Sequence, residues 1–220
     1  MITEKNVKFL KNVLNLENNK IDFSLLLKFL SVIKDDKKIK RDLIDSVSNN
    51  QFTSKTKLIE LINSLNILNK NSEIIIFGGW YGSIFIPKLS PLVKRITLID
   101  INEKVIRLSK NRLFNHYKNV DFINDDIFSK FRGRYSETKL FINTSCEHML
   151  SMKNWPWWNQ VNKNSYFAFQ SNNMFNIETH INCVNNINEF KKQLPEKSEI
   201  LIENEMIQDR GKIFMLLGKL

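Results

Sequence analysis

A short apolar run that ends in a glycine-rich turn is the feature that most constrains the fold of this chain. The run spans residues 74–77, and the sequence GGWYG follows at residues 78–82. An apolar run bounded by glycines is typical of a buried strand in a parallel sheet. Glycines would let the backbone turn sharply and approach a ligand closely, with the amides of the next helix pointing toward it. The stretch therefore predicts a strand, a ligand-binding turn and a helix.

A second strand-like segment, residues 95–99, ends in Asp100. In nucleotide-binding doubly wound folds, an acidic residue about 20 residues past the glycines accepts hydrogen bonds from ribose hydroxyls. The order of strand, glycine turn, helix, strand and terminal Asp fits that arrangement, so Asp100 is a candidate ribose ligand. GGWYG is not GxGxxG, however. An ordinary βαβ unit in which Asp100 only caps the next helix is therefore the alternative.

Length and composition indicate a globular protein with one main domain. The chain has 220 residues, of which 42% are apolar, and this is enough to bury a substantial core. The N-terminus lacks the basic region and apolar run of a signal peptide, and no apolar stretch approaches the roughly 18 residues of a membrane span. The two cysteines cannot form a disulfide framework and suit a reducing compartment. We therefore expect a cytoplasmic protein with no membrane partner.

The formal net charge of +10 draws attention to phosphate-bearing partners. Lys, Asn and Ile are all over-used, as expected of an AT-rich coding sequence, and the charge is spread along the chain. The densest cluster, residues 34–41 (KDDKKIKR), contains two acids and fits a solvated helix face better than a nucleic-acid patch. A nucleic-acid-modifying or nucleic-acid-binding protein is kept as an alternative to an enzyme with a small-molecule substrate.

Two regions of the chain differ in hydrophobic periodicity. Residues 1–70 carry apolar positions three and four apart, as in amphipathic helices, and the last of four helices should begin near Thr53. In residues 71–220, strand-like and helix-like segments alternate. We therefore predict an N-terminal helical cap over residues 1–70 and a Rossmann-like domain over residues 71–220. The polar segment 51–55 is the part of the cap best placed to approach a ligand.

A third strand is predicted at residues 120–123, directly before Asn124, Asp125 and Asp126. Parallel sheets bind ligands outside the carboxyl ends of their strands, so these carboxylates would lie beside the pocket. Asp125 or Asp126 could then hold an adenine amino group. The alternative is that Asp126 caps a short helix around Phe128.

Polar residues also follow the next two predicted strands. Residues 139–143 lead into TSCEH at 144–148, and residues 165–170 lead into SNN at 171–173. Between these strands we expect a helix, with the aromatic cluster WPWW at residues 155–158 near its end. Large aromatic side chains contribute to cores first, so we expect the cluster to pack against the sheet or the cap rather than to stack on bases.

The C-terminal region is predicted to close the sheet with a hairpin. A last helix is expected at residues 187–194, followed by strands at residues 199–203 and 212–217. The connection between these strands is too short for a crossover helix, so they should pair antiparallel.

A sheet of five parallel strands closed by a reversed hairpin resembles the class I S-adenosylmethionine-dependent methyltransferase fold, from residue 73 to residue 217. The sequences GGWYG (78–82), INTSCEHM (142–149), QSNN (170–173) and HINCV (180–184) together resemble a poorly characterised group of methyltransferase-like proteins of microbes and phages. The resemblance implies a Rossmann-like, mostly parallel seven-stranded sheet with an antiparallel last strand, and S-adenosylmethionine as the cofactor.

The resemblance also implies which residues hold the cofactor. The glycine turn would border the methionine part, Asp100 the ribose and Asp126 the adenine. Trp80 and Tyr81 stand where small residues are usual, which is a departure from the pattern of the fold. The candidate cofactor-binding residues are Gly78, Gly79, Trp80, Tyr81, Gly82, Asp100, Ile101, Asp125, Asp126 and Asn143.

Asn143 occupies the first position of the Asn-Pro-Pro-aromatic motif of amino-methyltransferases. Residues 144–146 (TSC) lack both prolines and the aromatic residue. This difference argues against N-methylation of adenine or glutamine by that route.

The chemistry of methyl transfer directs attention to the end of the fourth strand. Transfer from a sulfonium needs alignment, and a base if the acceptor carries a proton. Glu147 and His148, with Asn143, are the candidate catalytic residues, because His titrates near neutrality. The alternative is that Glu147 only favours the start of a helix through the dipole, and that His148 only caps or packs. Asn172, Asn173 and His180 are candidate substrate-binding residues.

The cysteines and two histidines suggest an alternative role for the same loops. They occur as Cys146-x-His148 and as His180-x-x-Cys183, after two strands that should be neighbours. Two His and two Cys side chains could bind zinc or iron tetrahedrally. The spacing is not a standard zinc motif, and Cys is often a small buried hydrophobe. A site without metal is therefore the first expectation.

Together these observations predict an S-adenosylmethionine-dependent transferase, in the first place a methyltransferase with a small or undetermined acceptor. Two alternatives use the same fold. One is different chemistry of the same cofactor, by aminocarboxypropyl transfer or by cleavage that releases methylthioadenosine. The other is modification or binding of nucleic acid.

Overall fold

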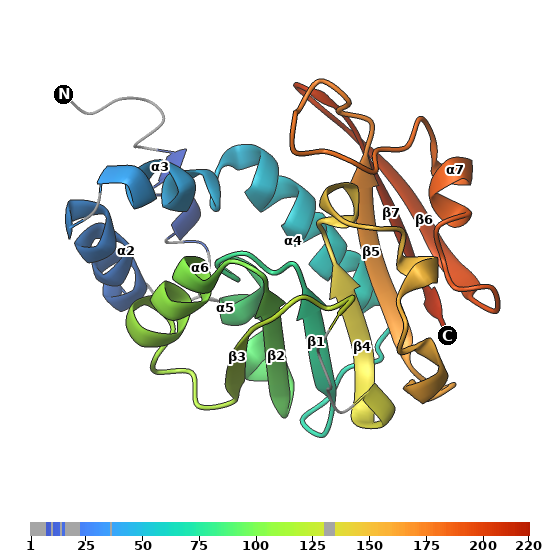
Figure 1. Cartoon of the computed structure of the whole chain (residues 1–220). Coiled ribbons are helices and arrows are strands. Elements are labelled where there is room, and N and C mark those ends of the chain that lie inside the picture. Colours follow the sequence, from blue (N-terminus) through green and yellow to red (C-terminus); the bar gives the residue numbers. More distant parts are fainter. Residues whose placement is uncertain (1–7, 10, 14, 16–22, 36, 130–134) are drawn as a thin grey trace.

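A seven-stranded mixed sheet forms the centre of the molecule (Figure 1). The computed structural model describes residues 8–9, 11–13, 15, 23–35, 37–129 and 135–220. The strands lie in the order β3-β2-β1-β4-β5-β7-β6. They are β1 (Glu73–Phe77), β2 (Arg95–Asp100), β3 (Val120–Asn124), β4 (Thr138–Asn143), β5 (Tyr166–Asn172), β6 (Glu199–Gln208) and β7 (Gly211–Lys219).

The direction of the strands confirms the predicted mostly parallel sheet. Strands β1 to β5 pair in parallel, whereas β7 is antiparallel to both of its neighbours, β5 and β6. The hairpin is longer than predicted, because β6 alternates between exposed and partly buried residues out to Gln208. This alternation is typical of an edge strand with one face toward solvent.

The apolar run of β1 lies at the middle of the sheet and is buried along its whole length. Its side chains alternate between the two faces, as in any strand. Ile74 and Ile76 join a core on the side of the N-terminal helices, and Ile75 and Phe77 join a second core on the opposite face. A continuous apolar strand is thus explained by burial on both faces.

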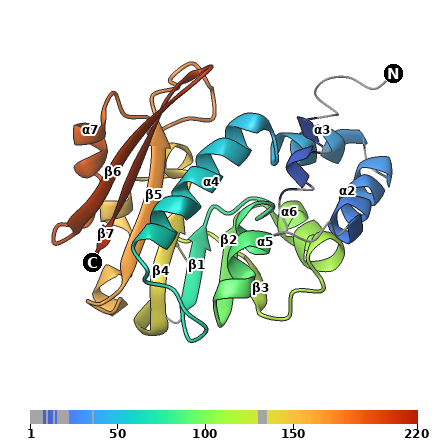
Figure 2. The same ribbon diagram turned by 180° about the vertical axis from the view of Figure 1, so that it is seen from behind.

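Helices cover mainly one face of the sheet, as the view from behind shows (Figure 2). This face carries α4, which crosses the sheet, and α5, while α2 and α3 continue the same layer beyond its edge. The helices are α2 (Phe23–Asp35), α3 (Lys37–Asp45), α4 (Asn49–Ser64), α5 (Phe85–Leu89), α6 (Glu103–Leu108) and α7 (Ile187–Lys191). No helix in these described parts of the chain is both long and apolar enough to cross a membrane.

The N-terminal helices pack on the segment that follows the glycine turn. Phe29 of α2 lies edge-on to Phe114, with ring centroids 6.3 Å apart. Ser46 and Ser83 share a buried hydrogen bond of 2.8 Å between their hydroxyl groups. Helix α4 begins at Asn49, earlier than the predicted Thr53. Much of the first predicted helix, residues 1–7, 10 and 14, lies outside the described residues.

The opposite face is covered by α7 and by an aromatic loop rather than by the helix predicted between β4 and β5. That connection contains three single 3-10 turns, Cys146–His148, Met152–Asn154 and Trp158–Gln160. Pro156 lacks a backbone N–H and so interrupts any helix there. The expected packing role of the aromatic cluster is confirmed, since Trp155 is 2% exposed and its ring lies 5.0 Å from that of Phe77.

Candidate active site

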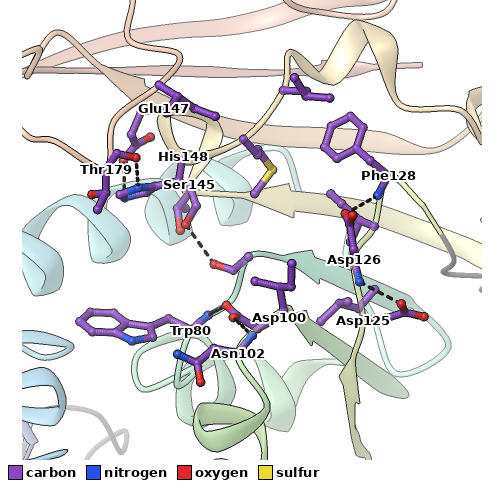
Figure 3. Close-up of a pocket in the computed structure, with 18 of the residues that line it drawn as sticks. Trp80, Asp100, Asn102, Asp125, Asp126, Phe128, Ser145, Glu147, His148 and Thr179 are labelled. Carbon is purple, nitrogen blue, oxygen red and sulfur yellow. Dashed lines mark hydrogen bonds and ion pairs between the residues drawn. The ribbon is translucent and has the colours of Figure 1, made fainter. Parts of the chain in front are cut away.

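A pocket of about 860 Å³ opens at the carboxyl ends of strands β1 to β4 (Figure 3). Gly78 and Trp80 line it after β1, Asp100 ends β2, and Asp125 follows β3. Glu147 lines it after β4. The volume lies within the range of about 300–1,000 Å³ that small-molecule sites occupy. The pocket therefore has the position expected of a ligand site in a parallel sheet.

The glycine turn has the sharp geometry that its sequence predicts. The backbone φ angle is +54° at Gly78 and +70° at Gly82, in the left-handed region that glycine tolerates. Trp80 adopts φ +47° although it carries a side chain. Such a conformation costs about 1–2 kcal/mol in a residue other than glycine, so other contacts must hold the turn in place.

Asp100 supplies one of the contacts that hold the turn, beside hydrogen bonds from the hydroxyl groups of Ser145 and Ser109 to the carbonyls of Gly78 and Tyr81. Its Oδ2 accepts a hydrogen bond of 2.8 Å from the backbone N–H of Trp80. Its Oδ1 accepts one of 2.9 Å from the backbone N–H of Asn102. Each carboxylate oxygen has a second lone pair. The same group can therefore hold the turn and still accept a hydrogen bond from a ligand in the pocket.

The two aromatic residues of the turn point in different directions. Tyr81 is 2% exposed and belongs to the core under the N-terminal helices. The Trp80 side chain is half-buried at the pocket wall, and its ring centroid is 5.4 Å from that of Tyr81. Neither Gly79, Tyr81 nor Gly82 is among the residues that line the pocket. The bulky residues of GGWYG thus leave the space above the sheet open.

Asp125 and Asp126 both line the pocket beyond the end of β3, and Figure 3 shows them on the same side as Asp100. The backbone N–H of Asp125 donates to the carbonyl of Asp100 at 3.2 Å. The Oδ1 atom of Asp126 accepts a hydrogen bond of 2.9 Å from the N–H of Phe128. Asp126 therefore makes the contact expected of a cap, but residues 127–129 form a turn rather than the predicted short helix, and Asp126 also lines the pocket.

Asn143, at the end of β4, is fully buried and does not line the pocket. Its Oδ1 accepts a hydrogen bond of 2.9 Å from the N–H of Ser145. Its amide N–H group faces the sulfur atoms of Met149 and Met152 at 3.1 Å each. The side chain thus organises the turn after β4. Its contacts with cofactor and acceptor stay predictions, because the side chain lies beneath the described pocket lining.

Glu147 and His148 lie in the 3-10 turn that follows β4, and both line the pocket. The predicted α-helix is absent at this point, so a helix dipole gives no account of Glu147. Burial raises the pKa of Glu147 to about 7, against the opposing effects of a backbone amide, Lys55 and Asn172. His148 is more exposed, and its Nδ1 atom lies 3.0 Å from the carbonyl oxygen of Thr179.

Lys55 also lines the pocket, although it was not among the site residues predicted from the sequence. It comes from α4, and burial lowers its pKa to about 8, while Glu147 and Asp100 act in the opposite direction. Gln51, one turn earlier, also lines the pocket. The polar segment 51–55 thus reaches the pocket, and its approach to a ligand stays a prediction. The polarity of that segment within an otherwise amphipathic helix was the available signal.

The candidate substrate residues after β5 lie behind the pocket wall. Asn172 is buried, and its Oδ1 accepts a hydrogen bond of 2.9 Å from the N–H of Met174. Asn173 accepts one of 2.7 Å from the N–H of Lys212. His180 is half-buried, and burial followed by the neighbouring His148 lowers its pKa. None of the three is among the residues that line the pocket.

The structure does not assemble the four-residue Cys and His set. The Sγ atom of Cys146 faces the backbone carbonyl of Asn143 at 3.8 Å in the core, and burial raises the pKa of this thiol. Cys183 lies closer, with its Sγ atom 3.6 Å from Nδ1 of His180. Burial also raises the pKa of Cys183. Within the described residues, the histidines come together with Glu147 rather than with both cysteines.

Comparison with solved structures identifies the fold of the chain. No family model and no characterised sequence matches the chain. The solved structure of the N-methyltransferase NodS from Bradyrhizobium japonicum WM9 matches with a TM-score of 0.61 and 15% identity, over 78% of this chain and 97% of that one. The chain has the class I methyltransferase fold. Residues of the site must then indicate its chemistry, because fold does not imply function.

Two further structures support the same assignment of the fold. NodS in complex with S-adenosyl-L-homocysteine matches with a TM-score of 0.58 and 13% identity, over 94% of this chain and 98% of that one. A SAM-dependent methyltransferase from Aquifex aeolicus matches with a TM-score of 0.55 and 11% identity, over 74% of this chain and 88% of that one. The shared part thus extends over most of both proteins.

Proposed function

We propose that this protein is an S-adenosylmethionine-dependent methyltransferase that acts on a small molecule. The observation that carries the proposal is the position of Asp100, which faces the pocket where β2 ends and is joined to the glycine turn after β1. In this class of fold, an acid at that point binds ribose hydroxyls. The resemblance of the motifs and the fold comparison support the same cofactor.

The residues around Asp100 fit the adenosine part of the cofactor. Ile101 is 73% exposed although it is a large apolar residue, and it lines the pocket. An adenine ring would cover this side chain, which accounts for its exposure. Asp125 and Asp126 lie on the same side and offer acceptors for an exocyclic amino group. Gly78 would lie beside the methionine part, where a side chain would obstruct a close approach.

The acceptor is assigned to the opposite side of the pocket, where Glu147, His148 and Lys55 lie. When bound, the cofactor supplies an electrophilic methyl group on a sulfonium. The residues of this chain contribute alignment, because transfer depends on holding the nucleophile and the methyl group in line. Glu147 and His148 are proposed to bind and orient the acceptor there.

The charges of the pocket support a small acceptor rather than a phosphate backbone. Among the described residues, four carboxyl groups line it, from Asp100, Asp125, Asp126 and Glu147, together with one lysine, Lys55. Nucleic acid is bound mainly through Lys and Arg contacts to phosphates. The basic residues behind the net charge of +10 are therefore not concentrated on the described part of the pocket lining.

Calorimetric titration with S-adenosylmethionine and with S-adenosylhomocysteine tests the proposal. Saturable binding of both with one site per chain is expected. Absence of binding for both ligands would reject the assignment of the cofactor. Product analysis then tests the reaction, since methyl transfer leaves S-adenosylhomocysteine. Release of methylthioadenosine would instead assign aminocarboxypropyl transfer or cleavage of the cofactor to the same pocket.

A further inference from the structure

Two histidines and one carboxylate meet at the edge of the pocket, although they come from two separate loops. One ligand-type atom from each of Glu147, His148 and His180 lies within 4.8 Å of the other two. The rings of His148 and His180 meet edge to face, with centroids 4.5 Å apart. Glu147 and His148 follow β4, whereas His180 belongs to the loop between β5 and α7.

Glu147 carries a buried oxygen, Oε2, without a hydrogen-bond partner within 3.5 Å among the described residues, although the Asn172 side chain lies near enough to lower the pKa of this carboxyl group. Its side chain is 9% exposed, and its Oε1 atom lies 3.8 Å from Nε2 of His148. Within the described residues, its Oε2 atom accepts no hydrogen bond, and no ion pair within 4.0 Å joins it to Lys55. Burying an unpaired carboxylate is costly. A buried carboxyl group in this condition is stabilised by protonation, by an ion pair or by a metal ion.

The surroundings of Glu147 fix its backbone as well as its side chain. Its carbonyl oxygen accepts hydrogen bonds from the N–H groups of Ile181 and Asn182, at 2.8 and 2.9 Å. The Asn182 amide also donates to the carbonyl of Cys146 at 3.2 Å. These bonds join the loop that carries Glu147 to the loop that carries His180. The backbones of the two loops that carry the three side chains are thus fixed relative to one another.

His148 is oriented as a metal-binding histidine usually is. Its Nδ1 atom lies 3.0 Å from the carbonyl oxygen of Thr179, which can only accept, so Nδ1 carries the proton. The lone pair is then on Nε2, the atom that faces Glu147. A carbonyl that fixes the tautomer in this way is the common outer partner of a metal-bound histidine.

We propose that Glu147, His148 and His180 bind a divalent first-row transition metal ion at the acceptor end of the pocket. Two imidazoles and one carboxylate suit Zn²⁺, Fe²⁺ or a similar ion, and they leave coordination positions open. Ligand atoms about 2.1 Å from one ion lie roughly 3 Å apart. Side-chain rotations would therefore complete the site if they brought Glu147 and His148 closer by less than 1 Å and each pair that includes His180 closer by less than 2 Å.

Binding of the metal ion does not depend on the cofactor. The role of the metal ion in the reaction, however, rests on the proposed function. Glu147 and His148 line the pocket, so an ion between them would be open to the acceptor. A divalent ion lowers the pKa of an oxygen or nitrogen atom that it binds. The acceptor would lose its proton to solvent, and its lone pair would form the bond to the methyl carbon as the sulfur–carbon bond breaks. The acceptor class implied is a molecule with a metal-coordinating hydroxyl or amine.

Metal titration of the purified full chain, freed of metal by a chelator, tests the site directly. Zn²⁺ binding is followed by competition with a chromophoric chelator, and Co²⁺ binding by its visible absorption. One ion per chain is expected, with Co²⁺ bands typical of nitrogen and oxygen ligands. A strong near-ultraviolet band from sulfur to cobalt would instead indicate that Cys183 is a ligand and would overturn this ligand set. Absence of stoichiometric binding would overturn the site.

Substitution of single ligands gives a second test. Glu147→Gln, His148→Gln and His180→Gln should each weaken Zn²⁺ binding by 10-fold or more. His116→Gln is the matched control, because His116 is the third histidine and lies exposed beside Lys28. Equal affinity in all four variants would overturn the assignment. Thermal unfolding of the metal-free variants shows whether each one still folds, and the Co²⁺ spectrum of the wild-type chain decides if one does not.

Substitution of Lys55 distinguishes a metal site from a cluster that has only a structural role. Its charge interacts with that of Glu147 without direct pairing, so it competes with a cation bound there. Lys55→Met should therefore tighten Zn²⁺ binding several-fold. Unchanged or weaker binding would contradict a metal ion beside Glu147. Binding of S-adenosylhomocysteine to the metal-free chain, measured separately, distinguishes failure of the metal site from failure of the proposed function.

Discussion

The carboxylate of Asp100 accepts a hydrogen bond of 2.8 Å from the backbone N–H of Trp80, and this bond joins the end of β2 to the turn after β1. The residue proposed to hold the ribose therefore also helps to fix the shape of the turn. Binding of a ligand at Asp100 and the conformation of the glycine turn are coupled through one side chain. Substitutions at Asp100 should accordingly affect both.

Removal of the Asp100 charge is predicted to weaken cofactor binding. Hydrogen bonds to a charged group contribute about 1.5–3 kcal/mol, so Asp100→Asn should weaken S-adenosylhomocysteine binding about 10-fold to 100-fold. Calorimetry measures the change. Asp121→Asn is the matched control, because Asp121 lies on β3 and pairs with Arg95 at the surface. Equal affinity of Asp100→Asn and the wild-type chain would exclude Asp100 as the ribose ligand.

The left-handed conformation of Trp80 predicts an unusual order of stability between two variants. Trp80→Ala and Trp80→Gly both remove the indole ring, but only glycine relieves the strain at φ +47°. Trp80→Gly should therefore be more stable than Trp80→Ala by about 1 kcal/mol. Urea denaturation measures both free energies of unfolding. The opposite order would mean that the turn is not held in this conformation in solution.

The two cysteines are predicted to differ in accessibility. Cys146 is 1% exposed in the core, whereas Cys183 is only partly buried. A neutral alkylating reagent should modify Cys183 in the native protein and Cys146 only after unfolding, as seen by peptide mass spectrometry. Cys183→Ser is the control and should leave the native protein unmodified. Rapid modification of Cys146 in that variant would contradict the placement of the β4 turn.

The strands and their terminal residues could be predicted because their signals are local. The apolar run of β1 and the terminal position of Asp100 follow from burial of a parallel sheet on both faces. The antiparallel hairpin follows from the short connection between its strands. The same reasoning placed Asp125 and Asp126 beside the pocket, since every parallel strand ends at the same edge of the sheet.

The arrangement of Glu147, His148 and His180 could not be predicted in this way. It depends on two loops whose backbones are joined by the hydrogen bonds from Ile181 and Asn182 to Glu147. The pattern of Cys and His residues suggested that both cysteines take part, but Cys146 alternates inward into the core. The turn after β4 is also too short and irregular to show a helical period, so the predicted helix was wrong there.

The aromatic loop that covers the second face offers a prediction with an internal control. The Nε1–H group of Trp155 donates a buried hydrogen bond of 3.0 Å to the carbonyl of Ile127, whereas Nε1 of Trp157 is buried without a partner in the described residues. Trp155→Phe should therefore lower the free energy of unfolding by about 1–3 kcal/mol.

Trp157→Phe removes an unpaired buried donor. It should therefore lower the free energy of unfolding clearly less than Trp155→Phe does, or raise it. Trp155→Ala should cost about 3–5 kcal/mol, because it also removes the ring that packs on Phe77 and Tyr135. Urea denaturation of the three variants measures these differences. If Trp157→Phe costs as much as Trp155→Phe, ring packing rather than the bond to Ile127 holds this loop on the sheet.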